Sequence, residues 1–286
     1  MLFKKGIPLP YLLTLPVVIA LIIVLFYPTI YAVLMCFQST GSGTGNPVFV
    51  GLENFKTLFT NKEFYQNGLN TLLFTIGSVG ISFLLGFGLA LLLNSIDFGV
   101  SVYRTVFILP IGVTPVVAGL TWNMLLNPLY GILNYFLGLI GIQPLGWTTD
   151  IRMALPSVIM IDVWQWTPFM LLILYAGLQM LPKEPYEAAL IDGASSLQSF
   201  RYVTFPLLKP IIAIAVVLRG LEAFKAFDII YTITKGGPGR ATETWIVRAY
   251  MESFRFHRME MGAVIGIIML IITILVCRRI VRVLEK

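Results

Sequence analysis

The sequence predicts an all-α polytopic membrane protein, and three observations lead to this class. Charged residues make up 12% of the 286-residue chain, about half of their usual share in soluble proteins. The mean hydropathy of +0.86 is too apolar for a protein that must cover a soluble surface with charge. Several apolar segments also reach the roughly 20 residues that a helix needs to cross a bilayer. We therefore expect a single membrane domain over residues 1–286.

Six segments qualify as transmembrane helices or come close. They extend over 11–36, 69–93, 106–126, 153–181, 207–233 and 261–277. The last is the shortest, but it can lengthen because the long side chains of Arg278 and Arg279 can reach the membrane interface. A further apolar run over 132–142 is too short to span and suits an interfacial or re-entrant piece. The sequence therefore predicts six spans.

Prolines punctuate several of these segments, namely Pro110, Pro115, Pro128, Pro156 and Pro168. Membrane helices tolerate such kinks when neighbouring groups satisfy the freed backbone. We interpret these prolines as features of helix packing rather than as gates.

The distribution of basic residues predicts the orientation. An even number of spans places both termini on one side of the membrane. Lys4 and Lys5 directly precede the first span, and Arg278 and Arg279 directly follow the last. The basic residues on the other side are spread over longer loops that contain more acids. The positive-inside rule therefore places both termini in the cytoplasm. The net charge of +6 follows this orientation, and no basic stripe with interleaved aromatic residues indicates nucleic-acid binding.

A polar loop over residues 182–206 separates the fourth and fifth spans. Pro185 suits a first helical turn, and Glu184 and Glu187 lie where the positive end of a helix favours acids. This predicts a short helix over 186–191, which Gly193 ends in a left-handed or sharply turned conformation. The result is a helix-turn-helix loop outside the bilayer, whose small residues allow another protein to approach closely.

The second helix of this loop is expected to begin near Leu197. Either Ser195 or Ser196 can cap it, and Pro206 is expected to end it where the fifth span begins. Phe200 is expected to pack back toward the helix bundle. The loop thus returns directly into the membrane.

The loop resembles the EAA signature of permease subunits of binding-protein-dependent ABC importers. The family pattern is Glu-Ala-Ala, three residues, Gly, nine residues, an aliphatic residue, any residue, an apolar residue and Pro. In this sequence it reads Glu187-Ala188-Ala189, Gly193, Val203, Phe205 and Pro206. Val and Phe replace the Ile and Leu of the family pattern. The place of the loop between the fourth and fifth spans is also similar to that in the family.

Further segments resemble the carbohydrate-uptake branch of this family, the maltose/trehalose/glycerol-phosphate importer type. These segments are 51–55, 70–71, 103–105, 109–110, 131–134, 164–169, 176–179 and 236–238. The resemblance extends over roughly residues 11–280. It implies a six-helix permease core in a prokaryotic inner membrane and a sugar or polyol as the substrate.

The resemblance also implies partners. These are a second, unlike permease subunit, two ATP-binding subunits and an extracytoplasmic solute-binding protein. The loop would be the coupling helix that docks in a groove of an ATP-binding subunit, with Glu187, Ala188, Asp192 and Gly193 as the contact residues. No cofactor is implied.

The predicted fifth span carries four ionisable residues at intervals of three: Arg219, Glu222, Lys225 and Asp228. On one helix each would lie about 60° back from the previous one, so the four would form a slanted stripe of alternating sign. Charges inside a membrane are costly and face a partner or a wet cavity. The stripe is therefore either a wall of a translocation pathway or a ladder of ion pairs against another helix.

The resemblance favours the pathway, because this stretch of the family borders the substrate cavity. Ala226 would then lie beside the stripe, and Trp166 and Thr167 of the fourth span would offer a stacking surface and a hydroxyl to a sugar. Asp162 is expected to be buried and to have its partner within the protein.

Other candidate sites are weak. The run 236–239, Gly-Gly-Pro-Gly, lacks the Gly-Lys-Ser/Thr of a phosphate loop and is interpreted as a turn. The single histidine, His257, has no second ligand at metal spacing. We therefore expect no nucleotide site, metal site or catalytic constellation in the chain, and ATP hydrolysis is expected in the partner subunits.

Three function classes remain. The first is the permease subunit of an ATP-driven importer. The second is an ion-coupled secondary transporter, which would show inverted-repeat halves and ion-binding acids at the membrane midplane. The third is a membrane enzyme, for which the sequence offers no catalytic residues. The dissimilar halves of the chain favour the importer. The sequence does not distinguish between identical and unlike permease partners.

Overall fold

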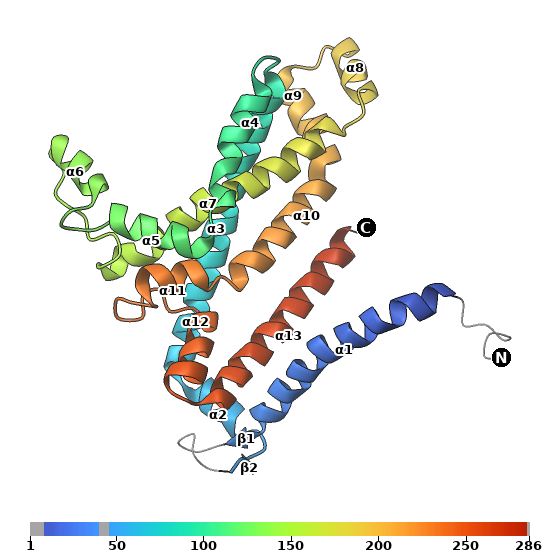
Figure 1. Cartoon of the computed structure of the whole chain (residues 1–286). Helices are drawn as coiled ribbons and strands as arrows, with labels where there is room; N and C mark the ends of the chain where they lie inside the picture. The colour runs from blue at the N-terminus through green and yellow to red at the C-terminus, as the bar shows by residue number, and fades with distance from the viewer. Residues whose placement is uncertain (1–8, 40–45, 285–286) are drawn as a thin grey trace. The chain divides into compact units, whose positions relative to one another are not determined.

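The computed structural model describes residues 9–39 and 46–284, and nearly all of this part is helical (Figure 1). The basic residues Lys4 and Lys5, which entered the prediction of orientation, lie outside the described residues. The described residues divide into two compact units, which are residues 9–39 and 46–62 with 249–271, and residues 63–248 with 272–284.

Unit 1 contains a long helix, a short hairpin and the beginning of the last helix. Its elements are α1 (Leu9–Cys36), β1 (Gln38–Ser39), β2 (Val48–Phe49), α2 (Glu53–Thr60), the π-helical segment η3 (Met251–Arg255) and the first half of α13 (Met259–Leu284). The strands pair antiparallel, with Gln38 opposite Phe49. The Asn54 side chain donates to the carbonyls of Cys36 at 2.9 Å and Gln38 at 2.8 Å, and thereby ties α2 to the end of α1.

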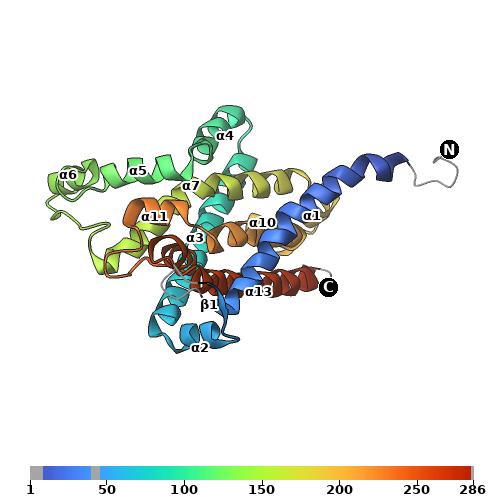
Figure 2. The ribbon, with the colours of Figure 1, turned by 60° about the horizontal axis from the view of Figure 1, so that its bottom comes forward.

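Unit 2 contains the remaining elements. In chain order they are α3 (Lys62–Ser95), α4 (Val100–Ile108), the 3-10 helix η1 (Leu109–Gly112), α5 (Pro115–Leu125), α6 (Ile132–Leu139), α7 (Ile151–Gln179), α8 (Glu184–Ile191), α9 (Ser196–Ser199), the π-helical segment η2 (Phe200–Thr204), α10 (Phe205–Phe224), α11 (Asp228–Thr234) and α12 (Trp245–Tyr250). The second half of α13 also belongs here. Figure 2 shows α11 beside α5, and α6 at the end of the α5 arm.

Helix α7 forms the centre of unit 2. Its side chains Val158, Ile161 and Leu174 are fully buried. Glycines allow α3 and α10 to approach it closely. A Cβ at Gly86 of α3 would lie 2.5 Å from the Met170 Cβ, and one at Gly177 of α7 would meet α10 side chains. Small residues at helix crossings permit this close packing in membrane proteins.

Asparagines hold the loops of unit 2 in place. The Asn70 side chain of α3 donates to the carbonyls of Arg240 at 2.9 Å and Glu243 at 3.0 Å. Asn134 of α6 donates to the Leu145 carbonyl at 3.0 Å and accepts from the Trp147 indole at 2.9 Å. These amides satisfy buried backbone groups that have no helical partner. Both residues lie in segments on which the family resemblance depends.

The structure contains four helices that are long and apolar enough to cross a membrane, or five if one bent pair is a single span, among the described residues. The four correspond to α1, α3, α7 and α13, and thus to the predicted first, second, fourth and sixth spans. Helix α3 is longer than predicted, since it begins at Lys62 rather than at residue 69. The number of six spans stays a prediction.

The predicted third span is not one straight helix. Residues 100–125 form two helical pieces that are bent by 93° between Gly112 and Pro115. The bend has a local cause. Pro115 has no N–H to donate and excludes its predecessor from the helical region, and Thr114 is accordingly extended, with φ −64° and ψ 144°. Pro115 thus turns the chain by about a right angle here, and its interpretation as a packing feature rather than a gate stays a prediction.

The predicted fifth span is also broken. Helix α10 ends at Phe224, and α11 begins at Asp228 after a non-helical step. The prediction that all four residues of the charged stripe share one helix is therefore wrong, since Asp228 opens a separate helix. No glycine or proline marks this break in the sequence.

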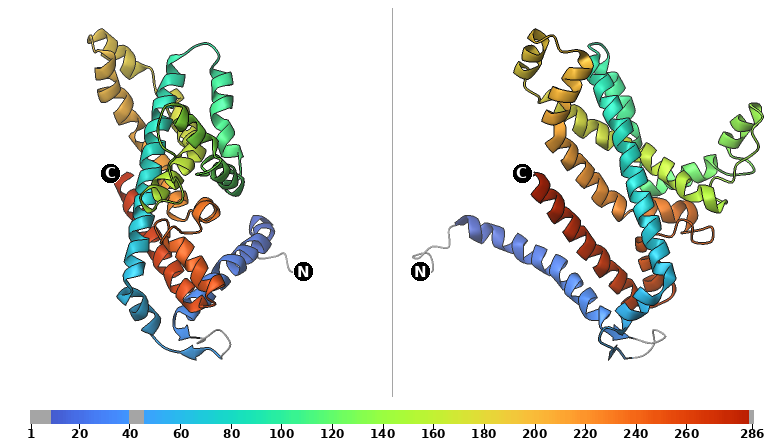
Figure 3. Two further views of the ribbon diagram at one scale, coloured as in Figure 1. Left: turned by 90° about the vertical axis from the view of Figure 1, so that its left-hand side faces the viewer. Right: turned by 180° about the vertical axis from the view of Figure 1, so that it is seen from behind.

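The polar loop between α7 and α10 has the predicted two helices, α8 and α9. Figure 3 shows this loop at the same end of unit 2 as the connection between α3 and α4. A hydrogen bond of 2.6 Å from the Gln179 side chain to that of Asn94 joins the end of α7 to the end of α3. The prediction that Pro206 ends the second helix is wrong, because the helix passes from α9 through η2 into α10. In η2 the Phe205 N–H donates five residues back to Phe200, and this wider turn accommodates the Pro206 ring.

Candidate functional site

A polar pocket lies in unit 2 at the break between α10 and α11. Its volume is about 210 Å³. The lining residues come from α7, from the break and the helix ends beside it, and from the beginning of α5: Pro115, Asp162, Gln165, Trp166, Glu222, Lys225, Ala226, Phe227, Asp228 and Ile229. Ionisable and amide side chains are concentrated here within otherwise apolar helices.

The pocket lies where two helices are interrupted. The break between α10 and α11 leaves Lys225, Ala226 and Phe227 outside regular helix, and all three line the pocket. At the bend before α5 the Gln165 side chain of α7 donates to the Val113 carbonyl at 2.7 Å. Irregular backbone at membrane depth is tolerated only where protein covers it or where it lines a cavity. The interruptions therefore place exposed backbone and polar side chains around one space.

A buried ion pair lies beside this pocket. Arg219 of α10 is fully buried and pairs with Asp162 of α7, and both contact the hydroxyl of Ser78 on α3. The Arg219 guanidinium also lies 5.1 Å from the centre of the Trp166 ring. Opposite charges at the centre of a bundle stabilise each other only when they pair directly. The three helices are thus joined next to the pocket, and Asp162 has its partner within the protein, as expected.

The structure brings four of the six predicted pathway residues to the pocket: Trp166, Glu222, Ala226 and Asp228. Glu222 also pairs with Lys225 at 2.9 Å, and both side chains are partly exposed. Arg219 and Thr167 are not among the lining residues. The Thr167 hydroxyl is buried and donates to the Val163 carbonyl one turn back in α7, at 2.7 Å.

Sequence reasoning missed Gln165 and Phe227 as pocket residues. Gln165 is buried, and its Oε1 has no hydrogen-bond partner among the residues that the structure describes. A buried amide oxygen without a partner is costly, and a ligand hydroxyl could satisfy it. The signal was available, because Gln165 lies one helical turn from Asp162 and beside Trp166 in the sequence. The place of Phe227 depends on the break in the helix, which the sequence does not mark.

The pocket combines groups that suit a polyhydroxylated solute. Glu222 and Asp228 can accept hydrogen bonds from hydroxyls, Lys225 can donate them, and the Gln165 amide can do either. The Trp166 ring offers an apolar face. Ligand sites typically pair apolar walls with a few placed polar groups. Within the described residues no three His, Cys, Asp or Glu side chains are grouped so as to hold a metal ion.

The second candidate site is the loop of α8 and α9. Gly193 follows α8 with φ +71°, in the left-handed region, as predicted. Ser195 and Gln198 form a reciprocal capping box at the start of α9, in which the Ser195 N–H donates to Gln198 Oε1 at 2.7 Å. The Tyr186 hydroxyl donates to that of Thr204 at 3.0 Å. This hydrogen bond fixes α8 against η2, so the loop has a defined shape.

All four predicted contact residues of this loop, Glu187, Ala188, Asp192 and Gly193, are exposed. Two large apolar side chains are exposed beside them, since Leu190 is 77% and Ile191 86% accessible. An exposed apolar patch with acids at its rim is typical of a protein interaction surface. A bilayer does not explain the patch, because Glu184 and Glu187 share the same short helix.

The chain is similar to known proteins over most of its length. The family model described as "Binding-protein-dependent transport system inner membrane component" matches residues 82–286. The trehalose/maltose transport system permease protein MalF of Thermococcus litoralis is 36% identical over 242 residues, which are 85% of this chain and 82% of that protein. The sn-glycerol-3-phosphate transport system permease protein UgpA of Agrobacterium fabrum is 34% identical over 273 residues, with 93% and 91% covered.

Solved structures share the fold. A chain from the crystal structure of a bacterial ABC transporter involved in the import of the acidic polysaccharide alginate superposes with a TM-score of 0.86, at 23% identity, over 97% of this chain and 95% of that chain. A chain of the bacterial alginate ABC transporter in complex with an alginate pentasaccharide-bound periplasmic protein gives a TM-score of 0.83, at 23% identity, over 95% and 92%. With the family match over residues 82–286, these findings show that the chain belongs to the inner membrane components of binding-protein-dependent transport systems.

Proposed function

We propose that the chain is one of two membrane-spanning subunits of an ATP-driven importer for a sugar or a related polyol. The other subunit would be an unlike permease. An extracytoplasmic binding protein would deliver the solute, and two ATP-binding subunits would bind on the opposite side. The proposal includes a prokaryotic inner membrane, six spans and cytoplasmic termini. The relatives named for trehalose, maltose and glycerol phosphate support the solute class.

The polar pocket at the α10–α11 break is the observation that carries this proposal. Among apolar helices it brings together Trp166, Glu222, Lys225 and Asp228, and it adds the unsatisfied Gln165 oxygen. We assign it to the translocation pathway. The solute would bind through hydroxyl hydrogen bonds and through contact with the indole. Because Arg219 is paired with Asp162, its role would be to hold the pocket's helices together rather than to bind the solute.

The α8–α9 loop would couple the pocket to the ATP-binding subunits. Its exposed apolar residues would enter a groove of the ATP-binding subunit, and Glu187 would face a basic residue there. Helix α8 connects to α7 at one end and, through η2, to α10 at the other. Both of these helices line the pocket. A displacement of the loop therefore acts on both walls, which is the geometry that alternating access requires.

Uptake by the reconstituted complex tests the proposal. Ala226→Trp would fill the pocket, and we expect it to reduce uptake of labelled sugar at least tenfold while the complex still assembles with its ATP-binding subunits. The matched control is Ile214→Trp, which lies on α10 at a 49% exposed position outside the pocket. Normal uptake by the Ala226→Trp complex, at equal subunit recovery, would contradict the assignment of the pocket.

A further inference from the structure

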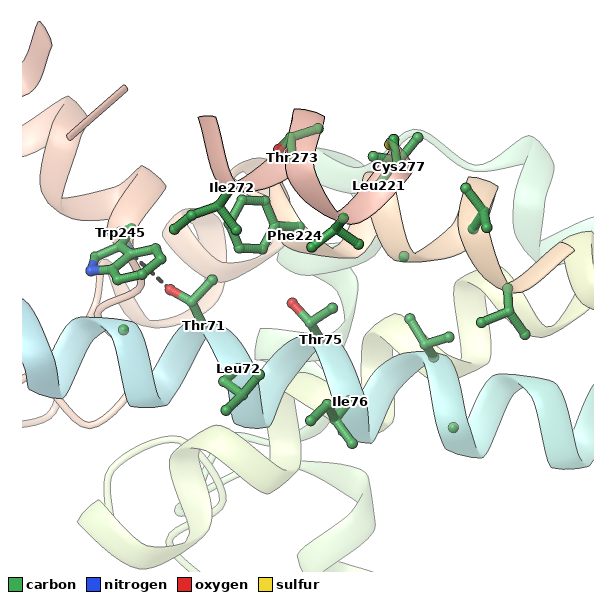
Figure 4. A pocket seen from close by; sticks show the side chains of 17 residues that line it. Thr71, Leu72, Thr75, Ile76, Leu221, Phe224, Trp245, Ile272, Thr273 and Cys277 are labelled. Carbon is green, nitrogen blue, oxygen red and sulfur yellow. Dashed lines mark hydrogen bonds between the residues drawn. The ribbon is translucent and has the colours of Figure 1, made fainter. Parts of the chain in front are cut away.

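The relatives of the chain leave the charge of its solute open. Trehalose and maltose, for which one relative is named, are neutral, whereas sn-glycerol-3-phosphate, for which another is named, is an anion. A mostly apolar groove of about 610 Å³ between α3, α10 and the second half of α13 has no Asp, Glu, Lys, Arg or His among its lining residues (Figure 4). The polar pocket at the α10–α11 break, by contrast, is lined by four such residues. Discrimination by charge is therefore a property of this pocket.

The charges around the polar pocket do not cancel. Asp162 lines the pocket, but its charge is matched by Arg219, with which it forms the buried ion pair. Glu222 is matched by Lys225, whose Nζ lies 2.9 Å from the Glu222 Oε1. Asp228 forms no ion pair within the described part of the chain. One negative charge of the pocket is therefore left unmatched.

The unmatched carboxylate lies where a solute in the pocket would meet it. Asp228 is exposed, lines the pocket and is the first residue of α11. The next residue, Ile229, is only 3% exposed, because α11 packs against α5 and α7. This packing fixes the backbone at Asp228, so that its carboxylate stays at the wall of the pocket.

An unmatched carboxylate at this place affects solutes according to their charge. Two unit charges 4 Å apart in bulk water interact strongly enough to change an equilibrium about fivefold, and more strongly where protein displaces water. A phosphate or carboxylate group in the pocket would be repelled by Asp228, whereas a neutral hydroxyl can donate a hydrogen bond to it. Lys225 could bind an anion only by leaving Glu222, which would then be unmatched as well. The charge balance thus favours neutral and cationic solutes.

We infer that the polar pocket accepts neutral and cationic solutes and rejects anionic ones, and that Asp228 determines this selectivity. The assignment rests on the proposed function, in which the solute passes through this pocket. It narrows the solute to a neutral sugar, a polyol or an amino sugar, and it excludes sugar phosphates and sugar acids. Asp228 is thereby a specificity-determining residue, whereas Arg219 holds the helices of the pocket together.

Charged thiol reagents of similar size test this selectivity without knowledge of the natural solute. Cys36→Ala and Cys277→Ala remove the native cysteines, and Ala226→Cys introduces one in the pocket. The assembled complex is treated with the anionic sulfonatoethyl or the cationic trimethylammonioethyl methanethiosulfonate, and modification of this subunit is followed by mass spectrometry. The ratio of the cationic to the anionic rate constant is compared with that for 2-mercaptoethanol, which cancels any change in the reactivity of the thiol itself.

We expect this ratio to exceed the 2-mercaptoethanol value about fivefold, as an unmatched charge near the thiol requires. The excess should shrink in about 1 M salt, where charges are screened within about 3 Å. Asp228→Asn removes the charge at nearly constant volume and should abolish the excess. Lys225→Met leaves Glu222 unmatched and should increase it. Asp97→Asn is the matched control, since it removes an equally exposed carboxylate outside the pocket and should leave the ratio unchanged.

The possible outcomes separate this selectivity from the proposed function. A ratio at the 2-mercaptoethanol value without any substitution at Asp228 would overturn the selectivity, even if Asp228→Asn failed to fold. An excess that Asp228→Asn leaves unchanged would overturn the role of Asp228. A faster reaction with the anionic reagent would show that Lys225 attracts anions instead. In these three cases the cysteine still reacts, so the pocket remains open to solutes and the proposed pathway stands. If Ala226→Cys reacts with neither reagent, the selectivity and the assignment of the pocket both fail.

Discussion

Arg219 is a full positive charge in the interior of a membrane helix bundle, with 0% of its surface exposed. Its partner Asp162 is 1% exposed, and the Ser78 hydroxyl completes the contact. The sequence predicted both a partner for Asp162 and an ionisable stripe, but it left open whether the stripe formed ion pairs or a wet wall. In the structure the four residues of the stripe have two different surroundings. Arg219 forms a buried ion pair, whereas Glu222, Lys225 and Asp228 line the pocket.

Removal of one partner of this pair should destabilise the protein strongly. We expect Arg219→Met to lower the free energy of unfolding by about 3–5 kcal/mol, because it leaves the Asp162 carboxylate buried without a counter-ion. Arg219→Met combined with Asp162→Asn should recover much of this loss. Unfolding of the purified chain in detergent measures both effects.

Lys225→Met provides the control for this series. It removes the Glu222–Lys225 pair, whose side chains are 44% and 61% exposed, and should cost no more than about 1 kcal/mol. Equal losses of unfolding free energy for Arg219→Met and Lys225→Met would mean that the buried Arg219–Asp162 pair contributes no more to stability than the exposed pair.

At the scale of elements, the α8–α9 loop was the most predictable part of the chain. Its helix starts, its capping serine and its left-handed Gly193 all depend on local chemistry that a sequence displays directly. The breaks in the third and fifth predicted spans were less predictable. Pro115 marks the first, but prolines inside α7 and α10 leave those helices continuous. The break in the fifth span contains no glycine or proline. It depends on the packing of α11 against α5 and α7, which no local sequence pattern displays.

Two substitutions at Gly193 distinguish the effect of its left-handed backbone conformation from the effect of a side chain on the loop surface. No atom lies within 4 Å of a Cβ at this position, so a side chain there meets no steric obstacle within the chain. Gly193→Val should still distort the turn, since the left-handed region costs an ordinary residue about 1–2 kcal/mol. Asparagine tolerates that region. We expect Gly193→Val to reduce recovery of the ATP-binding subunit in pull-down assays severalfold, and Gly193→Asn to leave it near normal.

The membrane level of each Gly193 variant must match that of the unchanged chain for this comparison. If both variants recover the ATP-binding subunit equally poorly, the loop surface itself tolerates no side chain at this position. If both recover it normally, the left-handed turn has no part in the contact.

At the scale of the whole molecule, composition was sufficient for the fold class, and the loop signature with its surrounding segments was sufficient for the family. The sequence did not display the contacts that hold these segments together. Asn70 and Asn134 were visible only as parts of a resemblance, whereas the structure shows Asn70 donating to the backbone at Arg240 and Asn134 to the backbone at Leu145. Contacts across 170 residues, such as Asn70 to Arg240, cannot be inferred from local periodicity.

The proposed energy source of transport belongs to this scale too, because ATP hydrolysis would take place in the partner subunits. We expect uptake by the complex to stop with vanadate, which blocks ATP hydrolysis in the partner subunits, and to continue with an uncoupler at fixed ATP. The purified chain alone should hydrolyse no ATP. Uptake that collapses with the uncoupler and resists vanadate would instead identify an ion-coupled transporter.

The π-helical segment η2 determines the rotation of α9 about the axis of α10, the membrane helix that follows it. A π turn contains one residue more than the α-helical turn it replaces, and each residue of an α-helix advances about 100°. Deletion of one residue within 200–204 would restore a uniform helix from Ser196 to Phe224, and it would turn α9 by about 100° relative to α10 and pull α8 away from the contact that Tyr186 makes with Thr204. The one extra residue of this turn therefore sets the direction in which α9 leaves α10, and with it the direction from which the loop meets another protein.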